Sequence, residues 1–441
     1  ATEQVLLAKS YGMTIIITDH HNLLENDQGE VILPEADAVI NTKRPDCIYP
    51  YKCLCGAGIA YKLVTALLEF YEIGEKASYQ EELLSYTAIA TVCDVMDLTG
   101  ENRIIVSHGL RLLKETKNKG LLALIDLCRI DLQQLSAFHL GYIIGPCLNA
   151  SGRLDTARKG LELLLTGSEE EALVLAAQVK ELNDVRKEMT ADNAGKAFQL
   201  IEESNLIREK VLVVYLPDCH ESIAGIIAGR VRERYNRPAI VLTGAKDCIK
   251  GSARSIEQYN MIEELSKCRD LLLKAGGHPM AAGLSLLPEN LELLRVRLNE
   301  NTILTDEMLI PKVVIDIRLP LGFLSEQLID ELKRLEPYGK CNDRPLFAEK
   351  DLKVKSAFVI GKNASGLRLR VQNQYGKEMD ALYFGDVEEF FQYIKENYGV
   401  EEADRLKTGR TLQNTLAVTY TPRINEYNGF KNIQIMIQNY R

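Results

Sequence analysis

A β-branched run that ends directly in two histidines limits this chain most. Residues 13–18 read MTIIIT, and Asp19, His20 and His21 follow without a gap. The length and composition of this run predict a buried strand of a parallel sheet, and residues 36–40 form a second run of the same kind. In α/β layers of this type, ligand sites gather at the carboxyl ends of the strands. We therefore expect Asp19, His20 and His21 to lie at such a site.

Composition and charge exclude several classes of protein. The 441 residues include 53 Lys and Arg against 62 Asp and Glu, a net charge of −9, and 46% are hydrophobic. That much apolar material excludes a disordered chain, and the acidic balance argues against a protein that coats DNA without specificity, although a locally basic groove stays open. No run of about 18 apolar residues occurs, so we expect no membrane span. Ten scattered cysteines favour reduced thiols and a cytoplasmic location.

The pattern of elements predicts an α/β chain in four parts. Helical stretches at 58–71 and 81–92 follow the first two strands. A capping box at 168–171 opens one long helix, with an apolar stripe of Leu175, Val179, Leu182, Val185 and Met189. Strands at 211–215 and 238–243 flank a helix at 222–235, and short β-like runs from 352 to 437, with an Asn428-Gly429 turn, predict a small barrel or sandwich. The predicted domains are 1–160, a connecting helix at 161–206, 207–300 and 301–441.

Two groups of polar residues near the first strand are candidate metal ligands. Asp19 offers a hard oxygen and the two adjacent histidines offer borderline nitrogens, a mixture that suits Mn²⁺ better than Mg²⁺. The alternative is that Asp19 caps the next helix and that His20 and His21 are ordinary turn residues. Asp94 and Asp97 follow an apolar helix and precede a glycine turn. There too, a carboxylate is either a cap or a ligand.

Three further segments are candidate phosphate sites. Arg153 lies on a predicted loop of small residues at 149–154, and a guanidinium grips phosphate with a planar fork. The segment 274–283 is rich in glycine and alanine around His278, which leaves the amides of Gly276 and Gly277 open to phosphate oxygens. The alternative there is a glycine-rich turn followed by a helix start.

Ser252 and Arg254 follow a predicted strand within a basic stretch. Between Gly229 and Ser255 there are seven basic and two acidic residues, an excess of 7 − 2 = +5. This excess predicts a local groove for a polyanion, and a solvated helix face accounts for part of it.

Taken together and in order, six motifs resemble those of the DHH/DHHA1 phosphoesterase superfamily, and within it the RecJ family of bacterial exonucleases. They are TDHH at 18–21, LCGAG at 54–58, CDVMDLTGENR at 93–103, LNASGR at 148–153, GSARS at 251–255 and GGHPMAAG at 276–283. The segments 220–230 and 335–347 also look like family segments, except that Cys341 stands where a glycine is usual. The resemblance covers nearly the whole chain.

The resemblance implies a fold and a set of roles. It implies a DHH domain with a two-metal site for Mn²⁺ or Mg²⁺, a long connecting helix, a DHHA1 domain facing it across a cleft, and an OB-fold that helps to hold a single strand. His20 and Asp94 would be metal ligands, with Asp19 and His21 supporting the site. The residues that would bind phosphate, with the 5′-terminal phosphate assigned to the first two, are Ser252, Arg254, Arg153, His278, Gly276 and Gly277.

One departure from the family concerns the start of the chain. The family carries two earlier acidic motifs, which supply much of the dinuclear site, and neither precedes residue 1 here. We therefore expect an amino-terminally truncated DHH domain whose sheet exposes apolar surface beside residues 14–18.

The resemblance implies a metal-dependent 5′ to 3′ exonuclease on single-stranded DNA, acting in repair and recombination. Its implied partners are a single strand with a 5′ end, a helicase and a single-strand-binding protein. One alternative is a non-catalytic single-strand-binding protein of DHH descent. Another is a DHH oligonucleotide or cyclic-dinucleotide phosphodiesterase, but such chains usually end at the glycine-rich motif, and this one continues for 441 − 283 = 158 residues.

Overall fold

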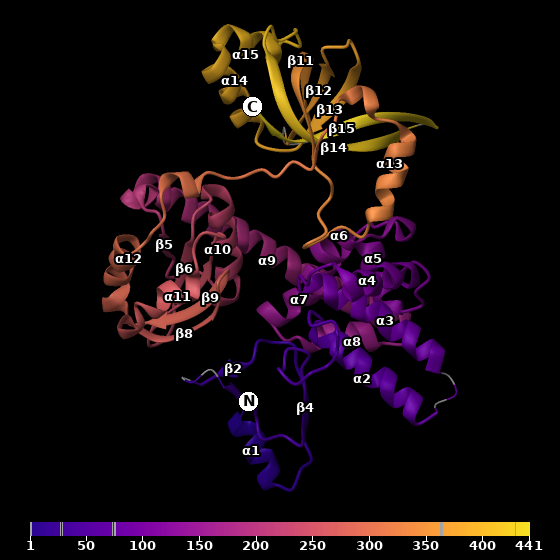
Figure 1. Cartoon of the computed structure of the whole chain (residues 1–441), viewed down its shortest axis with the longest axis vertical. Coiled ribbons are helices and arrows are strands. Elements are labelled where there is room, and N and C mark those ends of the chain that lie inside the picture. Colours follow the sequence, from indigo (N-terminus) through magenta and orange to yellow (C-terminus); the bar gives the residue numbers. More distant parts are fainter. Residues whose placement is uncertain are drawn as a thin grey trace. The chain divides into compact units, whose positions relative to one another are not determined.

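The computed structural model divides the chain into two compact units. It describes residues 2–26, 28, 30–72, 74, 76–361, 365–427 and 429–441. The first unit comprises residues 1–112, 136–138 and 313–441, and the second comprises residues 113–135 and 139–312. Figure 1 follows both units along the sequence.

The first unit begins with a small parallel sheet. Its first elements are α1 (Thr2–Ser10), β1 (Ile16–Thr18), β2 (Leu24–Glu25), β3 (Val31–Ile32) and β4 (Ala38–Ile40). Strands β1 and β4 pair in parallel, as the two β-branched runs predict. The expected burial of β1 is wrong: Ile16 is 60% exposed, because β4 is the partner strand of β1 among the described residues. This exposure agrees with the apolar surface expected beside residues 14–18.

Three helices follow and form the core of this part of the unit. They are α2 (Gly56–Phe70), α3 (Lys76–Cys93) and α4 (Gly100–Leu113). Buried side chains of all three pack with the loops between them, among them Ile59, Ala88 and Val106. Gly109 lets α4 approach α3 closely, since a Cβ there would lie 2.2 Å from the Cβ of Ala88. Asp94 follows directly after α3 and is held there by its backbone bond to Ala90 (2.9 Å).

The second unit opens with helices that pack along one long helix. They are α5 (Lys119–Leu127), α6 (Ala137–His139), α7 (Gly145–Leu154), α8 (Arg158–Leu165) and α9 (Glu169–Glu203). Ser168 caps α9 by accepting a hydrogen bond from the amide of Glu171, as the capping box predicts. The apolar stripe was misplaced at Val185, which is 43% exposed, because the buried face continues through small residues such as Ala194. Arg153 lies on helix α7 and not on a loop.

The rest of the second unit is a five-stranded sheet with helices on both faces. Its elements are β5 (Leu212–Tyr215), α10 (Glu221–Tyr235), β6 (Ala239–Gly244), β7 (Ile249–Arg254), α11 (Met261–Ser266), β8 (Leu272–His278), β9 (Ala281–Leu286) and α12 (Leu291–Glu300). The strand order is β5-β6-β7-β9-β8, with β5 and β6 parallel. Helix α10 covers one face together with α9, and α11 and α12 cover the other. The glycine-rich segment forms the β8–β9 hairpin, not a turn with a helix start.

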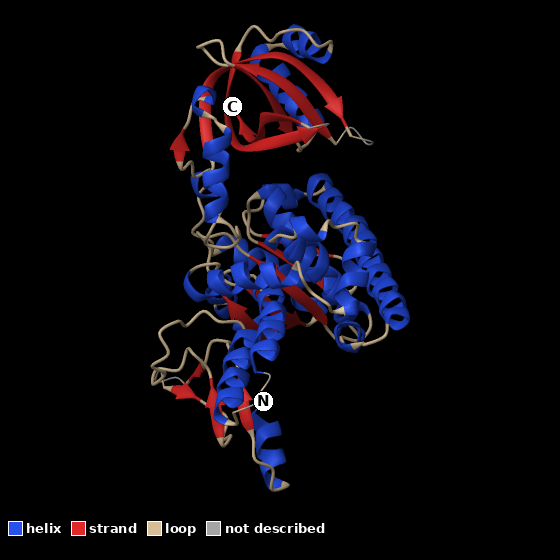
Figure 2. Cartoon of the chain, turned by 90° about the vertical axis from the view of Figure 1, so that its right-hand side faces the viewer, coloured by secondary structure: helices blue, strands red, loops and turns tan. Residues whose placement is uncertain are grey.

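The carboxyl-terminal part of the first unit is a closed ring of strands. Its elements are β10 (Ile317–Arg318), α13 (Glu326–Leu332), β11 (Phe347–Ile360), β12 (Gly366–Gln372), β13 (Glu378–Tyr383), α14 (Val387–Tyr398), α15 (Val400–Lys407), β14 (Thr415–Tyr427) and β15 (Phe430–Tyr440). The ring runs β11-β12-β13-β15-β14 and closes where β14 pairs with β11 (Figure 2). Strands β14 and β15 pair as a hairpin, and Asn428 of the predicted turn lies outside the described residues.

The core of this ring contains Leu352, Phe390 and Tyr420, all fully buried. Phe390 belongs to α14, a helix that the sequence patterns did not predict. In the part of the chain that the structure describes, no helix is both long and apolar enough to cross a membrane.

Candidate metal and phosphate sites

Asp19 organises a cluster of polar groups at the carboxyl end of β1. Its backbone amide bonds to the carbonyl of Ile40 at the end of β4 (2.9 Å). Its Oδ1 accepts hydrogen bonds from the amides of His20 (2.8 Å) and His21 (3.2 Å) and lies 2.7 Å from Nδ1 of the His21 ring. Burial raises the pKa of Asp19, but these hydrogen bonds outweigh it and hold the pKa below its ordinary value. The carboxylate is therefore ionised at neutral pH and fixes the ring of His21.

His20 faces a second carboxylate, from the end of helix α3. Its Nε2 lies 3.6 Å from Oδ2 of Asp94. Two ligands that are each about 2.1 Å from one cation lie at most about 4.2 Å apart, so this pair satisfies the limit for a shared ion. Gly56, at the start of α2, makes room for the imidazole, since a Cβ there would lie 3.5 Å from Cδ2 of His20.

The donor set fits a divalent cation of the Mn²⁺ or Mg²⁺ type. Ligand atoms of Asp19, His20 and His21 lie within 4.8 Å of one another, and Asp94 adds a further oxygen beside His20. The alternative role of Asp19 as a helix cap is wrong, because the described residues between His21 and Cys55 form no helix. Asp97 does not join this cluster and instead pairs with Lys340 (2.8 Å).

A separate polar site lies on the sheet of the second unit, under helix α10. Ser252 and Arg254 of β7 point to this face, because a Cβ on Gly225 of α10 would meet Nη2 of Arg254 at 2.8 Å and Oγ of Ser252 at 3.3 Å. Gly225 thus lets the guanidinium lie against the helix. Sequence reasoning missed this residue, although it lies within the family-like segment 220–230.

The strand register places His278 and Gly276 in line with these two residues. Arg254 pairs with Ala281, which pairs in turn with His278. In the same way Ser252 pairs with Gly283, which pairs with Gly276. Residues in one such row share a face of the sheet, and open space surrounds the Cβ positions of both glycines. The predicted residues therefore line one open stretch of this face.

Gly277 does not belong to this row. A Cβ on Gly277 would lie 2.3 Å from the carbonyl oxygen of Ala281, and its φ of +150° is rare for residues with side chains. The structure therefore gives Gly277 a backbone role and leaves Gly276 on the open face.

Arginines from three helices gather around the start of α10. Arg153 of α7 donates from Nη1 to the carbonyl of Ser222 in the first turn of α10 (2.8 Å). Burial first, and then the charge of Arg153, lower the pKa of both Arg186 and Arg254. Among the described residues, Arg153, Arg186 and Arg254 form no ion pair with a carboxylate. Guanidinium groups that lie close together without carboxylates are a binding site for an anion such as phosphate.

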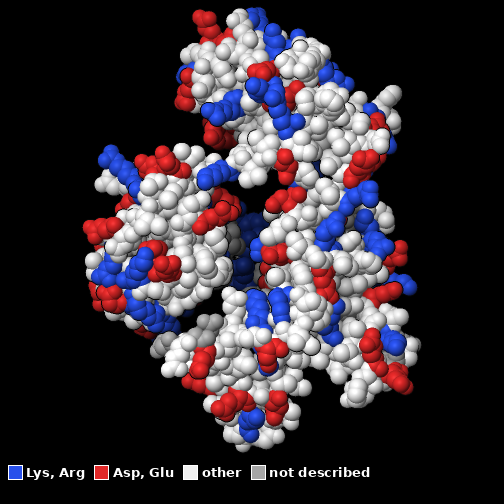
Figure 3. Space-filling view, viewed as in Figure 1, with Lys and Arg blue, Asp and Glu red and all other residues white. Residues whose placement is uncertain are grey.

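The basic excess at 229–255 forms a groove only in part. Arg234 pairs with Glu202 and Lys250 pairs with Glu221, both at 2.8 Å. Arg237 donates to the backbone carbonyl of Glu209 (2.8 Å). Basic and acidic side chains accordingly alternate on the surface of this sheet domain (Figure 3). Arg254 is the residue of this stretch that faces the open row.

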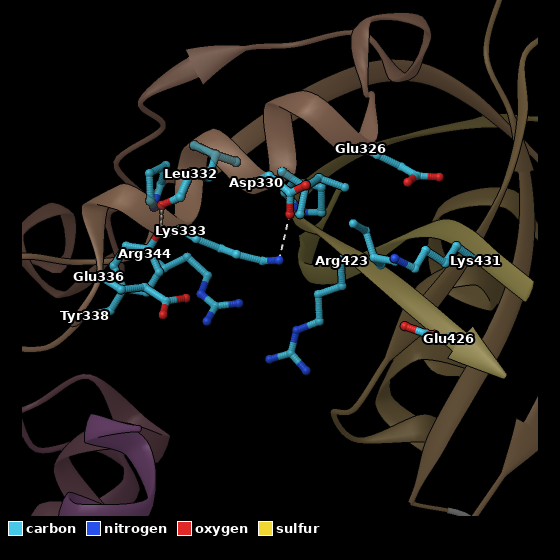
Figure 4. Close-up of a pocket in the computed structure, with 14 residues that line it drawn as sticks. Glu326, Asp330, Leu332, Lys333, Glu336, Tyr338, Arg344, Arg423, Glu426 and Lys431 are labelled. Carbon is cyan, nitrogen blue, oxygen red and sulfur yellow. Dashed lines mark hydrogen bonds and ion pairs between the residues drawn. The ribbon is translucent and has the colours of Figure 1, made fainter. Parts of the chain in front are cut away.

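A third polar site, a groove in the strand-ring domain, was not predicted. Residues of α13, the segment after it and β14 line a cavity of about 390 Å³. Arg344 and Arg423 extend into the same opening, and the Arg344 guanidinium lies 4.9 Å from the ring centre of Tyr338 (Figure 4). Burial and the charge of Arg344 lower the pKa of Arg423. Lys333, by contrast, pairs with Asp330 (2.6 Å).

Three domain families match consecutive parts of the chain. The DHH family amino-terminal domain matches residues 1–91, the DHHA1 domain matches residues 208–302, and the RecJ OB domain matches residues 315–439. Together with the fold and the two polar sites, these matches define a protein of the DHH–DHHA1 class with a carboxyl-terminal OB domain.

Individual relatives narrow the class to one family. The chain is 34% identical over 442 residues to the single-stranded-DNA-specific exonuclease RecJ of Bacillus subtilis, covering 99% of this chain and 52% of that protein. It is 36% identical to Escherichia coli RecJ, covering 77% of this chain and 61% of that protein. The crystal structure of Thermus thermophilus RecJ in complex with Mn²⁺ has a TM-score of 0.79 at 26% identity and covers all of this chain and 60% of that one. The chain belongs to the RecJ family, and it spans about half to three fifths of these relatives.

Proposed function

We propose that this chain hydrolyses phosphodiester bonds of single-stranded DNA from the 5′ end with a divalent metal ion. The observation that carries this proposal is the convergence of His20 and Asp94 at the carboxyl end of β1, with Asp19 holding His21 beside them. The family relatives are named as single-stranded-DNA-specific exonucleases, and structures of two family members carry manganese in their titles.

Each residue of the metal cluster receives a role in this proposal. His20 and Asp94 would hold Mn²⁺ or Mg²⁺, and the complete site would hold two ions. Bound ions would supply an activated water and would stabilise the leaving 3′ oxygen. Asp19 keeps the His21 ring in one orientation through the 2.7 Å contact, which leaves His21 available to the scissile phosphate.

The site on the second unit would bind the 5′-terminal phosphate. Ser252 offers a hydroxyl and Arg254 a half-buried guanidinium on the same face, and both are features of a phosphate contact. Arg153 and His278 would add further donors. The absence of a side chain at Gly276 leaves room for the phosphate, while Gly277 keeps the hairpin in the shape that this row requires.

The groove of the OB domain would hold the strand farther from its 5′ end. Tyr338 offers an aromatic surface for a base, and Arg344 and Arg423 offer two guanidinium groups for backbone phosphates. Stacking combined with cationic contacts is how such domains bind single strands without sequence preference.

One observation favours a second candidate, strand binding without hydrolysis. The cluster at β1 contains four metal donors among the described residues, Asp19, His20, His21 and Asp94. That is a small set for two octahedral ions. A cyclic-dinucleotide phosphodiesterase is disfavoured, because such an enzyme has no need of the OB domain that residues 315–439 match.

The proposed substrate also bears on location and partners. Action on bacterial DNA corresponds to the cytoplasm. Since the proposed enzyme needs a free single strand, a helicase and a single-strand-binding protein are its proposed partners.

The test is degradation of 5′-phosphorylated single-stranded DNA in Mn²⁺, with a duplex of the same sequence beside it. His20→Ala should abolish turnover and leave strand binding nearly unchanged. His108→Ala is the matched control, because His108 lies on the surface of α4 and contacts Arg111 (2.8 Å). Turnover that survives His20→Ala would contradict the proposed metal site. Strand binding without turnover by the unmodified chain would favour the second candidate.

A further inference from the structure

Two cysteine side chains meet inside the helical part of the second unit. Cys128 is the C-cap of α5, and its thiol hydrogen-bonds to that of Cys147 on α7. Both helices pack against α9. Cys147 is fully buried, whereas Cys128 is partly exposed. One thiol is therefore open to a small reagent, and the second lies directly behind it.

The charges around this pair favour ionisation of the outer thiol. The hydrogen bond from Cys147 lowers the pKa of Cys128 most; burial raises it, Lys180 and Lys187 of α9 lower it further, and Asp184 opposes them. The result is a pKa of about 7, so about half of this group is thiolate at neutral pH. The same hydrogen bond, followed by burial, raises the pKa of Cys147 and keeps it protonated.

A side chain of α9 holds the inner thiol in place. Asn183 donates from Nδ2 to Sγ of Cys147 (3.2 Å). The amide cannot turn freely, because its Oδ1 accepts from Nε (3.1 Å) and Nη2 (2.9 Å) of Arg186. An N–H directed at Sγ stabilises the negative charge that develops when Cys147 loses its proton. The inner thiol is thus positioned to react with its neighbour.

We propose that Cys128 and Cys147 form a reversible dithiol–disulfide site that peroxide oxidises. The Cys128 thiolate attacks one oxygen of hydrogen peroxide, the O–O bond breaks, and the products are a sulfenic acid and hydroxide, which takes up a proton to form water. The sulfur of Cys147 then attacks the sulfur of Cys128 and displaces the hydroxyl group, which leaves as a second water with the Cys147 proton. Two thiols and one peroxide give one disulfide and two waters, and a dithiol reductant reverses the change.

Other cysteines of the same unit lack this arrangement. Burial raises the pKa of both Cys219 and Cys268, so these side chains stay protonated at neutral pH. Cys248 is partly exposed like Cys128, and it lies just before the outer part of the sheet at β7. It is the matched control for accessibility.

The test treats the full chain with a small excess of hydrogen peroxide at pH 7 and maps its cysteines by peptide mass. The expected product is a disulfide between Cys128 and Cys147, with the loss of two thiols and full return after reduction. Cys128→Ser should prevent this loss, and Cys248→Ser should leave it unchanged. Circular dichroism of each variant checks that it has folded.

A second measurement does not depend on the disulfide. The rate of Cys128 alkylation against pH should show its midpoint near 7 in the unmodified chain and nearer to 8.5 in Cys147→Ala. Sulfenic or sulfinic acid on Cys128 with a free Cys147 would overturn the proposal. Oxidation of other cysteines before this pair, or an alkylation midpoint that Cys147→Ala leaves in place, would overturn it as well.

Discussion

Asp97 and Lys340 form an ion pair of 2.8 Å that joins two distant segments of the first unit. Beside it, the amide of Leu98 donates to the carbonyl of Lys340 (2.8 Å), and Arg103 donates to the carbonyl of Arg334 (2.9 Å). The segment that enters the OB domain is therefore bound to the loop that follows α3. That loop begins with a proposed metal ligand, and the bound segment lines the proposed strand groove, so the two sites share one piece of backbone.

Lys340→Ala should weaken this connection in a pH-dependent way. The pair is partly exposed, so we expect a loss of at most about 1 kcal/mol in the free energy of unfolding. Lys340 is the largest influence that lowers the pKa of Asp97 in the folded state. A lowered pKa stabilises the fold above the ordinary aspartate value of about 3.9, and this contribution disappears as the pH falls through the lowered value.

Urea unfolding at a series of pH values measures this difference. The gap between the unmodified chain and Lys340→Ala should be full at pH 6 and should close under acid conditions. Lys350→Ala, which removes an exposed lysine of β11, should show no gap. A gap that stayed constant at all pH values would show that the ion pair is not its cause.

Cys341→Gly should stabilise the chain. Cys341 has a φ of +60°, a left-handed conformation that costs a residue with a side chain about 1–2 kcal/mol. The substitution removes that cost but also removes the contact of the thiol with Asp97, so we expect a net gain of about 1 kcal/mol and a higher Tm. Cys341→Ala loses the contact and keeps the strain, so its Tm should not rise. Equal Tm values for the two variants would refute the role of the backbone.

Local patterns predicted the elements whose cause is local. Ser168 and Glu171 are three residues apart and cap α9 through a direct contact, so the start of that helix could be predicted. The segment that carries Arg153 could not be assigned in this way. Its small residues are typical of a loop, but they are buried where α7 packs against α9, and the packing makes them helical. The domain boundaries at 160, 206 and 300 stay predictions.

The candidate sites needed pairings between distant strands. The motifs identified Ser252, Arg254 and His278, but only the register through β9 shows that they line one face. The groove of Arg344 and Arg423 had no sequence signal, because its residues come from segments that meet only when the ring of strands closes. The roles of these residues stay proposals.

Gly277→Ala and Gly276→Ala should separate folding from binding in the β8–β9 hairpin. A methyl group on Gly277 would lie 2.3 Å from the backbone oxygen of Ala281, which cannot move aside, and we expect a loss of roughly 2–3 kcal/mol in stability. A methyl group on Gly276 meets nothing within 4 Å and should change stability by less than about 0.5 kcal/mol. Urea unfolding measures both effects. Equal losses would contradict the assignment of the two glycines to different roles.

Gly225→Ala should weaken the proposed phosphate site without harming the fold. The new methyl group would lie 2.8 Å from Nη2 of Arg254, at the flexible end of that side chain, so the guanidinium must move away from Ser252. We expect the preference for a 5′-phosphorylated over a 5′-hydroxyl oligonucleotide to fall about tenfold, the effect of one charge-assisted hydrogen bond of about 1.5 kcal/mol. Stability should not fall, because alanine is the better helix former by up to about 1 kcal/mol.

Gly229→Ala is the matched control, because Gly229 lies one turn farther along α10 and a Cβ there meets nothing within 4 Å. It brings the same gain in helix propensity and leaves Arg254 in place. Fluorescence anisotropy with both oligonucleotides gives the ratio of the two Kd values for each variant. A lower ratio in Gly225→Ala alone attributes the preference to Arg254. If both variants lowered the ratio, the cause would be the helix itself, and an unchanged ratio in both would remove Arg254 from the phosphate site.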